Sequence, residues 1–410
     1  MRLPSRDGVS NTVARPLMVS AWQLDRITHG GGSRVAWPSA GRGAWQALFA
    51  LSDEASPFLS SSWTGEWLGT FGESLRPAQL VFDDATGRTI GTCLLTRRAK
   101  AFGPIALRRA YLNTDGEDPS ESVIIEHNAV LTAPGHERQV VRALADYLDA
   151  TNVDEFYASG LGEHDVDRLR AAFPRWGFEV EWRESPYVDL TRLRLEGRSH
   201  LDVLSANTRA QMRRAMRAYA SRGAFTIEVA SSPAEAETML AELISLHNTH
   251  WRRKGQEGAF ASLQRQRFHG GFTHAGVIAG ECVLLRVRIG DQTIGVVYCI
   301  VAKGRVHFYQ AGFAYESDPK IKPGFITHHL AIEHFLQHNY REYDFLASAP
   351  NEGRYKRSLA TDVRRLGWVM LSRAGIRRAV FDLARSARNA FRTGTPAARN
   401  VRESSTASTV

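Results

Sequence analysis

Residues 305–346 read RVHFYQAGFAYESDPKIKPGFITHHLAIEHFLQHNYREYDFL, and this stretch decides the fold. Its beginning, 305–313, has the composition of a strand, and the apolar spacing of 325–338 is that of a helix. A second strand is indicated at 342–346. Because a strand, a helix and another strand are the unit of mixed α/β sheets, the stretch predicts an α/β fold.

The loop before that helix combines several features of an anion site. Lys320 and Lys322 precede Pro323 and Gly324, and the helix begins near Phe325. Pro presets the helical backbone, Gly allows close approach, and the free N–H groups and the dipole of a helix start attract phosphate. An ordinary Pro-Gly turn has the same sequence, so phosphate binding here is a hypothesis that depends on the rest of the chain.

The chain of 410 residues is long enough for two cores, because single cores stop growing at about 250–300 residues. We predict two tandem α/β domains, 45–190 and 191–372, each a mixed, mostly antiparallel sheet flanked by helices. Residues 1–44 are rich in Gly, Ser, Pro and Arg and are predicted to be flexible. Residues 373–410 are predicted to form a basic amphipathic helix and a disordered tail.

Two segments of the first predicted domain have the patterns of regular elements. Aromatic residues recur at near-helical spacing from Phe58 to Phe71, after Pro57, which predicts an amphipathic helix with one buried face. The apolar segment 122–131 is predicted to be a strand.

Basic residues outnumber acidic ones by 52 to 43, and the net charge is +9, which favours anionic ligands. The cysteines Cys93, Cys282 and Cys299 lie in apolar stretches without metal-binding spacing, so we expect reduced core residues. Neither a signal peptide nor a transmembrane run of about 18 apolar residues is seen. The expectation is a soluble, cytoplasmic protein of bacterial type.

Five motifs occur in the same order as in one known family. They are PFLSSSWTGEWLGTFG from Pro57, LSANTRAQMRRAMR from Leu204, LHNTHWRRKG from Leu246, KPGFITHHLAIEHFLQH from Lys322 and YDFLASAPNEGRYKRSLA from Tyr343. Together they resemble the BioF2-like or CelD-like acetyltransferase family of the GNAT superfamily, which is related to the FemAB peptidoglycan transferases. The resemblance covers roughly residues 45–372.

The resemblance implies a degenerate first GNAT domain and a catalytic second one that holds an acyl-CoA, or in Fem relatives an aminoacyl-tRNA. Lys320, Lys322, Pro323, Gly324 and Phe325 would then occupy the pyrophosphate-binding position of the GNAT fold. After the Asp-Phe pair the chain has Ala-Ser-Ala-Pro where the family has a glycine, and it lacks the aromatic residue that follows the family's lysine. The acyl acceptor therefore stays open.

Acyl transfer to an amine needs a base, donors for the oxyanion and an acid for the departing thiolate. Asp344 is a candidate base or acceptor-binding carboxylate, or else a salt-bridge partner of Arg341. Lys356 is a candidate oxyanion or phosphate contact. His247 is a second candidate base, or a partly buried structural histidine, and Tyr309 is a candidate acid, or a core residue. Direct attack by the acceptor is preferred, because no cysteine has an activating partner nearby in sequence.

Four further residues are predicted to contact the substrate: Trp251, Gln310, His328 and Tyr355. His247 and His250 are three residues apart on the predicted helix that carries Trp251. No further metal ligands occur at suitable spacing, so no metal is expected.

Arginine stripes occur in two predicted helices. Arg209, Arg213 and Arg217 lie four residues apart, either on a solvated face or as a guide for an anionic acceptor such as a sugar nucleotide, a lipid headgroup or tRNA. Segment 374–392 is predicted to be a basic amphipathic helix that packs on the domain or makes peripheral contact with the inner membrane.

Three hypotheses follow. The leading one is an N-acyltransferase that uses acetyl-CoA or a longer acyl-CoA as co-substrate, without a metal and without nucleic acid. Its small-molecule acceptor would be an amine, or as second choice a hydroxyl, of a sugar, an amino acid or a cell-envelope or polysaccharide precursor. The alternatives are a Fem-like aminoacyltransferase that draws on charged tRNA, and a non-catalytic scaffold that binds a membrane or a partner protein.

Overall fold

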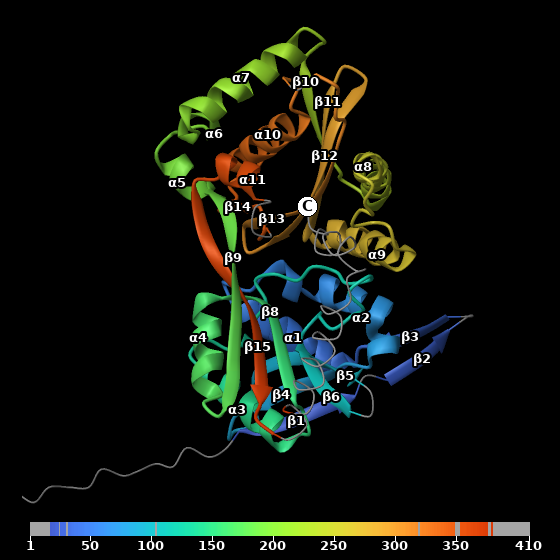
Figure 1. Ribbon diagram of the computed structural model, residues 1–410, viewed down its shortest axis with the longest axis vertical. Coiled ribbons are helices and arrows are strands. Elements are labelled where there is room, and N and C mark those ends of the chain that lie inside the picture. Colours follow the sequence, from blue (N-terminus) through green and yellow to red (C-terminus); the bar gives the residue numbers. More distant parts are fainter. Residues whose placement is uncertain are drawn as a thin grey trace, which may run out of the picture.

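The computed structural model describes residues 17–375 except 24, 30–31, 103–104, 319 and 349–352, and it also describes residue 379. Figure 1 shows an elongated molecule in which two α/β halves are stacked and connected by two long strands. The elements of the first half are β1 (Met18–Gln23), β2 (Asp25–His29), β3 (Gly32–Ala36), α1 (Ser39–Leu51), the 3-10 helix η1 (Pro57–Leu59), α2 (Ser61–Leu75), β4 (Ala78–Asp83), β5 (Thr89–Phe102), β6 (Ile105–Leu112), β7 (Leu131–Thr132), α3 (Glu137–Ala150), β8 (Glu155–Gly162), α4 (Glu163–Ala172) and β9 (Trp176–Asp189).

The second half continues the same alternation of helices and strands. Its elements are α5 (Leu190–Leu195), α6 (His200–Val203), α7 (Ala206–Ala220), β10 (Phe225–Val229), α8 (Pro233–Arg253), α9 (Leu263–Ala279), β11 (Cys282–Ile289), β12 (Gln292–Ala302), β13 (Arg305–Phe313), α10 (Pro323–Gln337), β14 (Glu342–Asp344), α11 (Arg354–Leu359) and β15 (Asp362–Arg373).

One large sheet runs through both halves, in the order β1-β4-β5-β6-β8-β15-β9-β14-β13-β12-β11-β10, with β7 attached to β5. Its pairs are mostly antiparallel, and the β6/β8 and β13/β14 pairs are parallel. The parallel pairs arise because a helix connects their strands, α3 in the first half and α10 in the second. The predicted mixed, mostly antiparallel α/β fold flanked by helices is confirmed.

The two halves share two long strands, β9 and β15. β15, the last strand in sequence, lies between β8 and β9, and it pairs with β9 from Asp362, opposite Tyr187, to Arg373, opposite Trp176. The end of β9 in turn pairs with β14 of the second half. The predicted unit 191–372 is therefore not self-contained, because its final strand completes the sheet of the first half.

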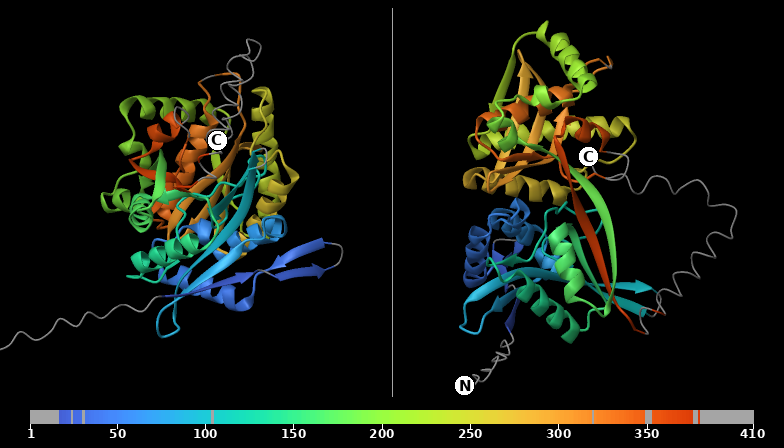
Figure 2. Two further views of the ribbon diagram at one scale, coloured as in Figure 1. Left: turned by 60° about the horizontal axis from the view of Figure 1, so that its bottom comes forward. Right: turned by 90° about the vertical axis from the view of Figure 1, so that its left-hand side faces the viewer.

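Two sequence-based expectations are corrected by long-range pairing. Within the predicted flexible segment 1–44, residues 18–23 form β1, which pairs with β4, and α1 begins at Ser39. The β2–β3 hairpin projects from the side of the first half (Figure 1 and Figure 2). Segment 122–131 is not the predicted strand; it joins the sheet through the bridge of Asn128 to Leu161 and through β7. Residues 1–16 and nearly all of 374–392 lie outside the described residues.

The aromatic helix α2 packs the first half against the second. It begins after Ser60, whose hydroxyl accepts a hydrogen bond from the N–H of Trp63 at 3.2 Å, as a helix N-cap does. The Trp63 ring meets Phe268 and Phe272 of α9 edge to face, with ring centroids 4.8 Å and 5.0 Å away. This packing is a continuous apolar core that fixes the two halves relative to each other.

In the part of the chain that the structure describes, no helix has the length and apolar character needed to span a bilayer.

Candidate functional site

The parallel strands β13 and β14 pair over three residues and then separate. Their last pair is His307 opposite Asp344. Just beyond it the backbone of Leu346 takes a φ of 60°, and its N–H donates to Oδ1 of Asp344 at 2.7 Å instead of continuing the sheet ladder. The separation opens a cavity of about 950 Å³ whose walls include Gln310 on one strand and Ala347 after the other.

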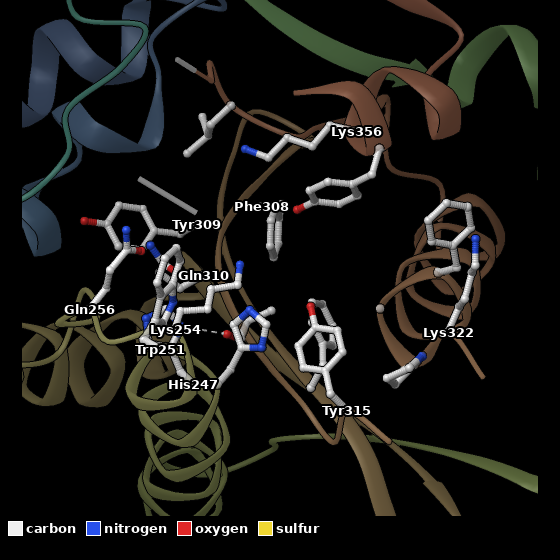
Figure 3. Close-up of a pocket in the computed structure, with 18 of the residues that line it drawn as sticks. His247, Trp251, Lys254, Gln256, Phe308, Tyr309, Gln310, Tyr315, Lys322 and Lys356 are labelled. Atoms are coloured by element: carbon white, nitrogen blue, oxygen red, sulfur yellow. Dashed lines mark hydrogen bonds between the residues drawn. The ribbon is translucent and has the colours of Figure 1, made fainter. Parts of the chain in front are cut away.

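This cavity gathers most of the predicted site. The predicted residues that line it are His247, Trp251, Tyr309, Gln310, Lys322, Pro323, Gly324, Phe325, Tyr355 and Lys356. Figure 3 shows Trp251 and Lys254 on the α8 side and Lys322 on the opposite side, where α10 begins. Residues of α8, β13, α10 and α11, which are far apart in sequence, therefore meet around one cavity.

The start of α10 faces the cavity with cationic and backbone donors. Among the described residues no side chain caps this helix, so the N–H groups of its first turn, beginning at Gly324, stay available to a ligand. Lys322 is held near the helix by a hydrogen bond of 2.5 Å from its Nζ to Oε1 of Gln211. A Cβ placed at Gly324 would lie 3.2 Å from the Phe313 ring, so a larger residue there intrudes on the wall. Lys320 is exposed and does not line the cavity.

Lys356 brings a buried ammonium group to the cavity. It lies on α11, is 3% exposed, and its Nζ is 5.9 Å from the centroid of the Phe308 ring. A buried charge must be compensated, and the aromatic face and the nearby carboxyl of Glu126 provide part of this compensation. Lys356 thus lies in the cavity wall, and its contact with an oxyanion or phosphate stays a prediction.

Glu126 was not predicted from the sequence, although it lines the same cavity. Its carboxyl is almost fully buried, and Oε2 accepts a hydrogen bond from the N–H of Ala347 at 2.6 Å. Burial, assisted by the charge of Asp344, raises the pKa of Glu126 to about 8 against the lowering effects of the Ala347 amide and Lys356. The available sequence signal was a lone acidic residue within the apolar segment 122–131.

His247 lines the cavity but is not a free base. Its Nδ1 lies 3.1 Å from the carbonyl oxygen of Ala311, and its Nε2 accepts the N–H of Ala259 at 3.1 Å. Both ring nitrogens are therefore engaged by the backbone, and burial lowers the pKa of His247 to about 4. The assignment of His247 as a general base is wrong on this geometry, because it holds α8 to β13 as a neutral ring.

Tyr309 keeps a hydroxyl at the cavity wall. The hydroxyl oxygen accepts the N–H of Ile124 at 3.1 Å, so its hydrogen is left to be donated elsewhere. Burial raises the pKa of Tyr309, which keeps the phenol protonated. The ring also packs 5.5 Å from Trp63, so Tyr309 has both the packing role and the cavity position considered from the sequence.

Besides Lys320, two predicted residues, Asp344 and His328, lie outside the cavity. Asp344 is fully buried, and its Oδ1 accepts hydrogen bonds from Ser185 and Leu346, while Arg364, not Arg341, is its arginine partner at 3.6 Å. His328 lies beneath the cavity wall, with its ring 4.5 Å from Phe308 and its Nδ1 3.1 Å from the Tyr343 hydroxyl. Neither residue lines this cavity, and the contacts that each makes are those of a buried structural residue.

Known proteins resemble this chain in one domain or in the fold. Residues 206–357 match the family model described as an acetyltransferase (GNAT) domain, and this segment supplies nearly all of the cavity wall. The solved structure of FemX is similar over 88% of this chain and 99% of that chain, with a TM-score of 0.55 and 10% identity. A conserved protein of unknown function from Bacteroides thetaiotaomicron VPI-5482 is similar over 82% of this chain and 98% of that chain, with a TM-score of 0.52 and 13% identity. No curated protein matches the chain.

The fold and the family match together define the class of the protein. It is an acyltransferase that contains a GNAT domain at residues 206–357. Across both halves the chain has the fold of FemX, so the expected likeness to the FemAB-like transferases is confirmed at the level of fold.

Proposed function

We propose that this protein transfers the acyl group of an acyl-CoA to an amine. The observation that carries the proposal is that the cavity between the separated strands β13 and β14 runs to the uncapped start of α10. The pyrophosphate of CoA would accept hydrogen bonds from the backbone N–H groups of Gly324 and Phe325, with Lys322 beside it. A cavity of about 950 Å³ is in the range that takes a ligand of this size.

The reaction forms one C–N bond and breaks one C–S bond. The acceptor nitrogen attacks the thioester carbonyl carbon, the amine gives up a proton, and the departing thiolate takes one. Lys356 is placed to stabilise the negative charge on the carbonyl oxygen, Glu126 to accept the amine proton and Tyr309 to supply a proton to the thiolate. All three assignments depend on the position of these side chains in one cavity wall.

Direct attack by the acceptor is favoured over an acyl-enzyme. Cys93, Cys282 and Cys299 are buried, and burial raises the pKa of each thiol. None of them lines the cavity, and thiols that stay protonated are poor nucleophiles. The acceptor amine, on a sugar, an amino acid or an envelope precursor, would therefore react with the thioester itself.

One observation favours an aminoacyl-tRNA as the alternative donor. α7, whose Gln211 contacts Lys322 at the cavity rim, exposes Arg213, Arg214 and Arg217 to solvent. A polyanion that reached the cavity along this helix would bind with strong salt dependence. Binding of uncharged tRNA that weakens steeply with salt, without any response to CoA, would select this alternative.

The decisive experiment follows the thermal stability of the protein with CoA, acetyl-CoA and longer acyl-CoAs. A ligand that binds the native state raises the melting temperature by mass action. Gly324→Glu should abolish the shift, because it adds a negative side chain at the phosphate position and intrudes on Phe313. Gly43→Glu is the matched control: a Cβ there meets no atom of the described residues within 4 Å.

The outcomes separate the possibilities clearly. A shift that is lost in Gly324→Glu and kept in Gly43→Glu supports the proposal, and release of free CoA thiol on addition of an amine would complete it. No shift with any CoA compound rejects the acyl-CoA donor. A non-catalytic scaffold that binds a membrane or a partner would give neither the shift nor thiol release.

A further inference from the structure

Three side chains that the proposed reaction does not use meet where β13 and β14 begin to separate. His307 and Asp344 are the last paired residues of these strands, and His127 reaches them from the first half. One potential ligand atom from each residue lies within 4.8 Å of the other two, and Nε2 of His127 is 3.2 Å from Oδ2 of Asp344. The backbone of His127 has a φ of 50°, in the left-handed region.

The facing atoms of this cluster lack hydrogen bonds. Nε2 of His127, Nδ1 of His307 and Oδ2 of Asp344 are all buried, and in the described part of the chain none has a hydrogen-bond partner. The close contact of His127 with Asp344 is an ion pair when the imidazole is protonated. Buried polar atoms without a hydrogen bond cost folding free energy, so three of them close to one another favour a shared ligand.

We propose that His127, His307 and Asp344 bind a first-row divalent cation, for which Zn²⁺ is the representative probe. Two neutral imidazoles and one carboxylate are ligands that such ions prefer, at about 2.0–2.2 Å. The ion would draw the three ligand atoms to roughly 3.4 Å from one another, the spacing that tetrahedral bonds of this length require. Water fills the remaining coordination from a second cavity of about 820 Å³, which His127 and Arg364 line.

The surroundings of Asp344 orient it for this role. Its other oxygen, Oδ1, accepts hydrogen bonds of 2.7 Å from the Ser185 hydroxyl and from the N–H of Leu346, which leaves Oδ2 directed at the histidines. Such outer contacts fix the geometry of metal-binding carboxylates. The cluster therefore has both the ligands and a supporting shell.

Arg364 is the nearby charge that opposes a cation. Its Nε lies 3.6 Å from Oδ2 of Asp344, so it competes for that oxygen. The guanidinium is also bound to Glu342 at 2.7 Å and lies 3.9 Å from the ring centroid of Tyr187. These contacts offset its charge and hold it on β15, so the cation displaces only the weaker, longer contact with Asp344.

A cation here would connect the two halves of the molecule. His127 belongs to the first half, whereas His307 and Asp344 belong to the second. The neighbours of the ligands, Glu126 and Leu346, line the large cavity. Metal binding would therefore stabilise the point from which the strands separate, independently of which acyl donor the protein uses.

The test is a zinc titration of the full-length protein after chelator treatment, in competition with a chromogenic chelator. We expect one equivalent to bind, and Co²⁺ to give visible absorption bands at the same stoichiometry. His307→Ala should weaken binding by about a hundredfold or more, and His127→Gln, at a partly exposed position, repeats the test if the first variant fails to fold. Ser185→Ala, which leaves all three ligands, should weaken it by about tenfold.

The control is the pair formed by His334 on α10 and the exposed His338 that follows this helix, whose rings stack 4.0 Å apart and could bind zinc at the surface. His338→Ala should leave the binding of one equivalent of zinc unchanged. Absence of zinc binding in the wild type overturns the proposal, and so does binding that survives His127→Gln and disappears in His338→Ala. In either case the cluster is an ion pair and nothing more.

Discussion

Oε2 of Glu126 accepts a hydrogen bond of 2.6 Å from the backbone N–H of Ala347, and this contact joins the two halves of the chain inside the large cavity. Glu126 follows β6 of the first half, whereas Ala347 follows β14 of the second. The GNAT match covers residues 206–357, so one functional group of the site comes from outside the matched domain. The first half is thus part of the site as well as of the fold.

Glu126→Gln tests this contribution with little change of shape. The amide oxygen still accepts the N–H of Ala347, but the side chain can no longer take a proton. We expect the rate of acyl transfer to fall by about 10²–10⁴, the usual effect of losing a general base, with little change in acyl-CoA affinity. Steady-state kinetics measure the first effect and thermal shift the second. A loss below threefold would remove Glu126 from the reaction.

Lys356→Met tests stabilisation of the carbonyl oxygen. The variant keeps the length and packing of the side chain beside Phe308 but loses its charge. Removing one such donor costs about 10²–10³ in kcat, so we expect kcat to fall far more than KM rises. Lys320→Gln is the control, because that lysine is exposed and outside the cavity. Equal losses in both variants would indicate a general charge effect.

His247→Ala separates structure from catalysis. The imidazole is bonded to the carbonyl of Ala311 and to the N–H of Ala259, and both partners are left without it in the variant. Leaving buried groups unpaired predicts a loss of about 2–4 kcal/mol in the free energy of unfolding. Denaturant unfolding measures this loss. The rate per folded molecule should stay close to that of the wild type, and a loss of rate without a loss of stability would restore His247 as a base.

The bounds of helices and strands depend on local sequence, whereas the pairing of strands does not. The strand β13 and the helix α10 were predicted close to their observed bounds, because apolar periodicity is read within one segment. The place of a strand in the sheet depends instead on a partner elsewhere in the chain. For this reason the sequence did not reveal β1 against β4 or β15 between β8 and β9.

The residues of the candidate site likewise divide into those that a local motif predicts and those whose role depends on distant contacts. Gly324 and Lys322 were found because their motif is contiguous, and the family resemblance supplied Lys356. Glu126 was missed because its partner Ala347 is 221 residues away. His247 was overrated because the sequence does not show that two backbone groups occupy its ring nitrogens.

Glu117 gives the protein a pH-dependent stability. Burial, assisted by the charge of Asp115, raises the pKa of Glu117 to about 8, although the Trp67 indole donates to it. The folded state therefore binds more protons than the unfolded state between pH 4.5 and 8, and the unfolding free energy falls as pH rises through this window. The slope from this one group is at most about 1.4 kcal/mol per pH unit.

Glu117→Gln should remove that slope, because the amide does not titrate and can still accept the indole N–H. The measurement is chemical denaturation of both proteins between pH 5 and 8.5. We expect the variant to gain stability relative to the wild type as pH rises. Parallel curves for the two proteins would show that Glu117 is ionised in the folded state throughout.

Truncation tests the strand exchange between the halves. A chain that ends at Arg373 retains β15, whereas one that ends at Thr361 leaves β8 and β9 unpaired along the line that β15 occupies. Open edges of this length promote aggregation, and the buried side chains of β15, such as Leu366 and Leu371, would be lost from the core. We therefore expect the shorter chain to aggregate and the longer one to unfold cooperatively. A shorter chain that keeps a folded first half, seen as a protease-resistant fragment that ends near residue 190, would show that each half closes its sheet alone.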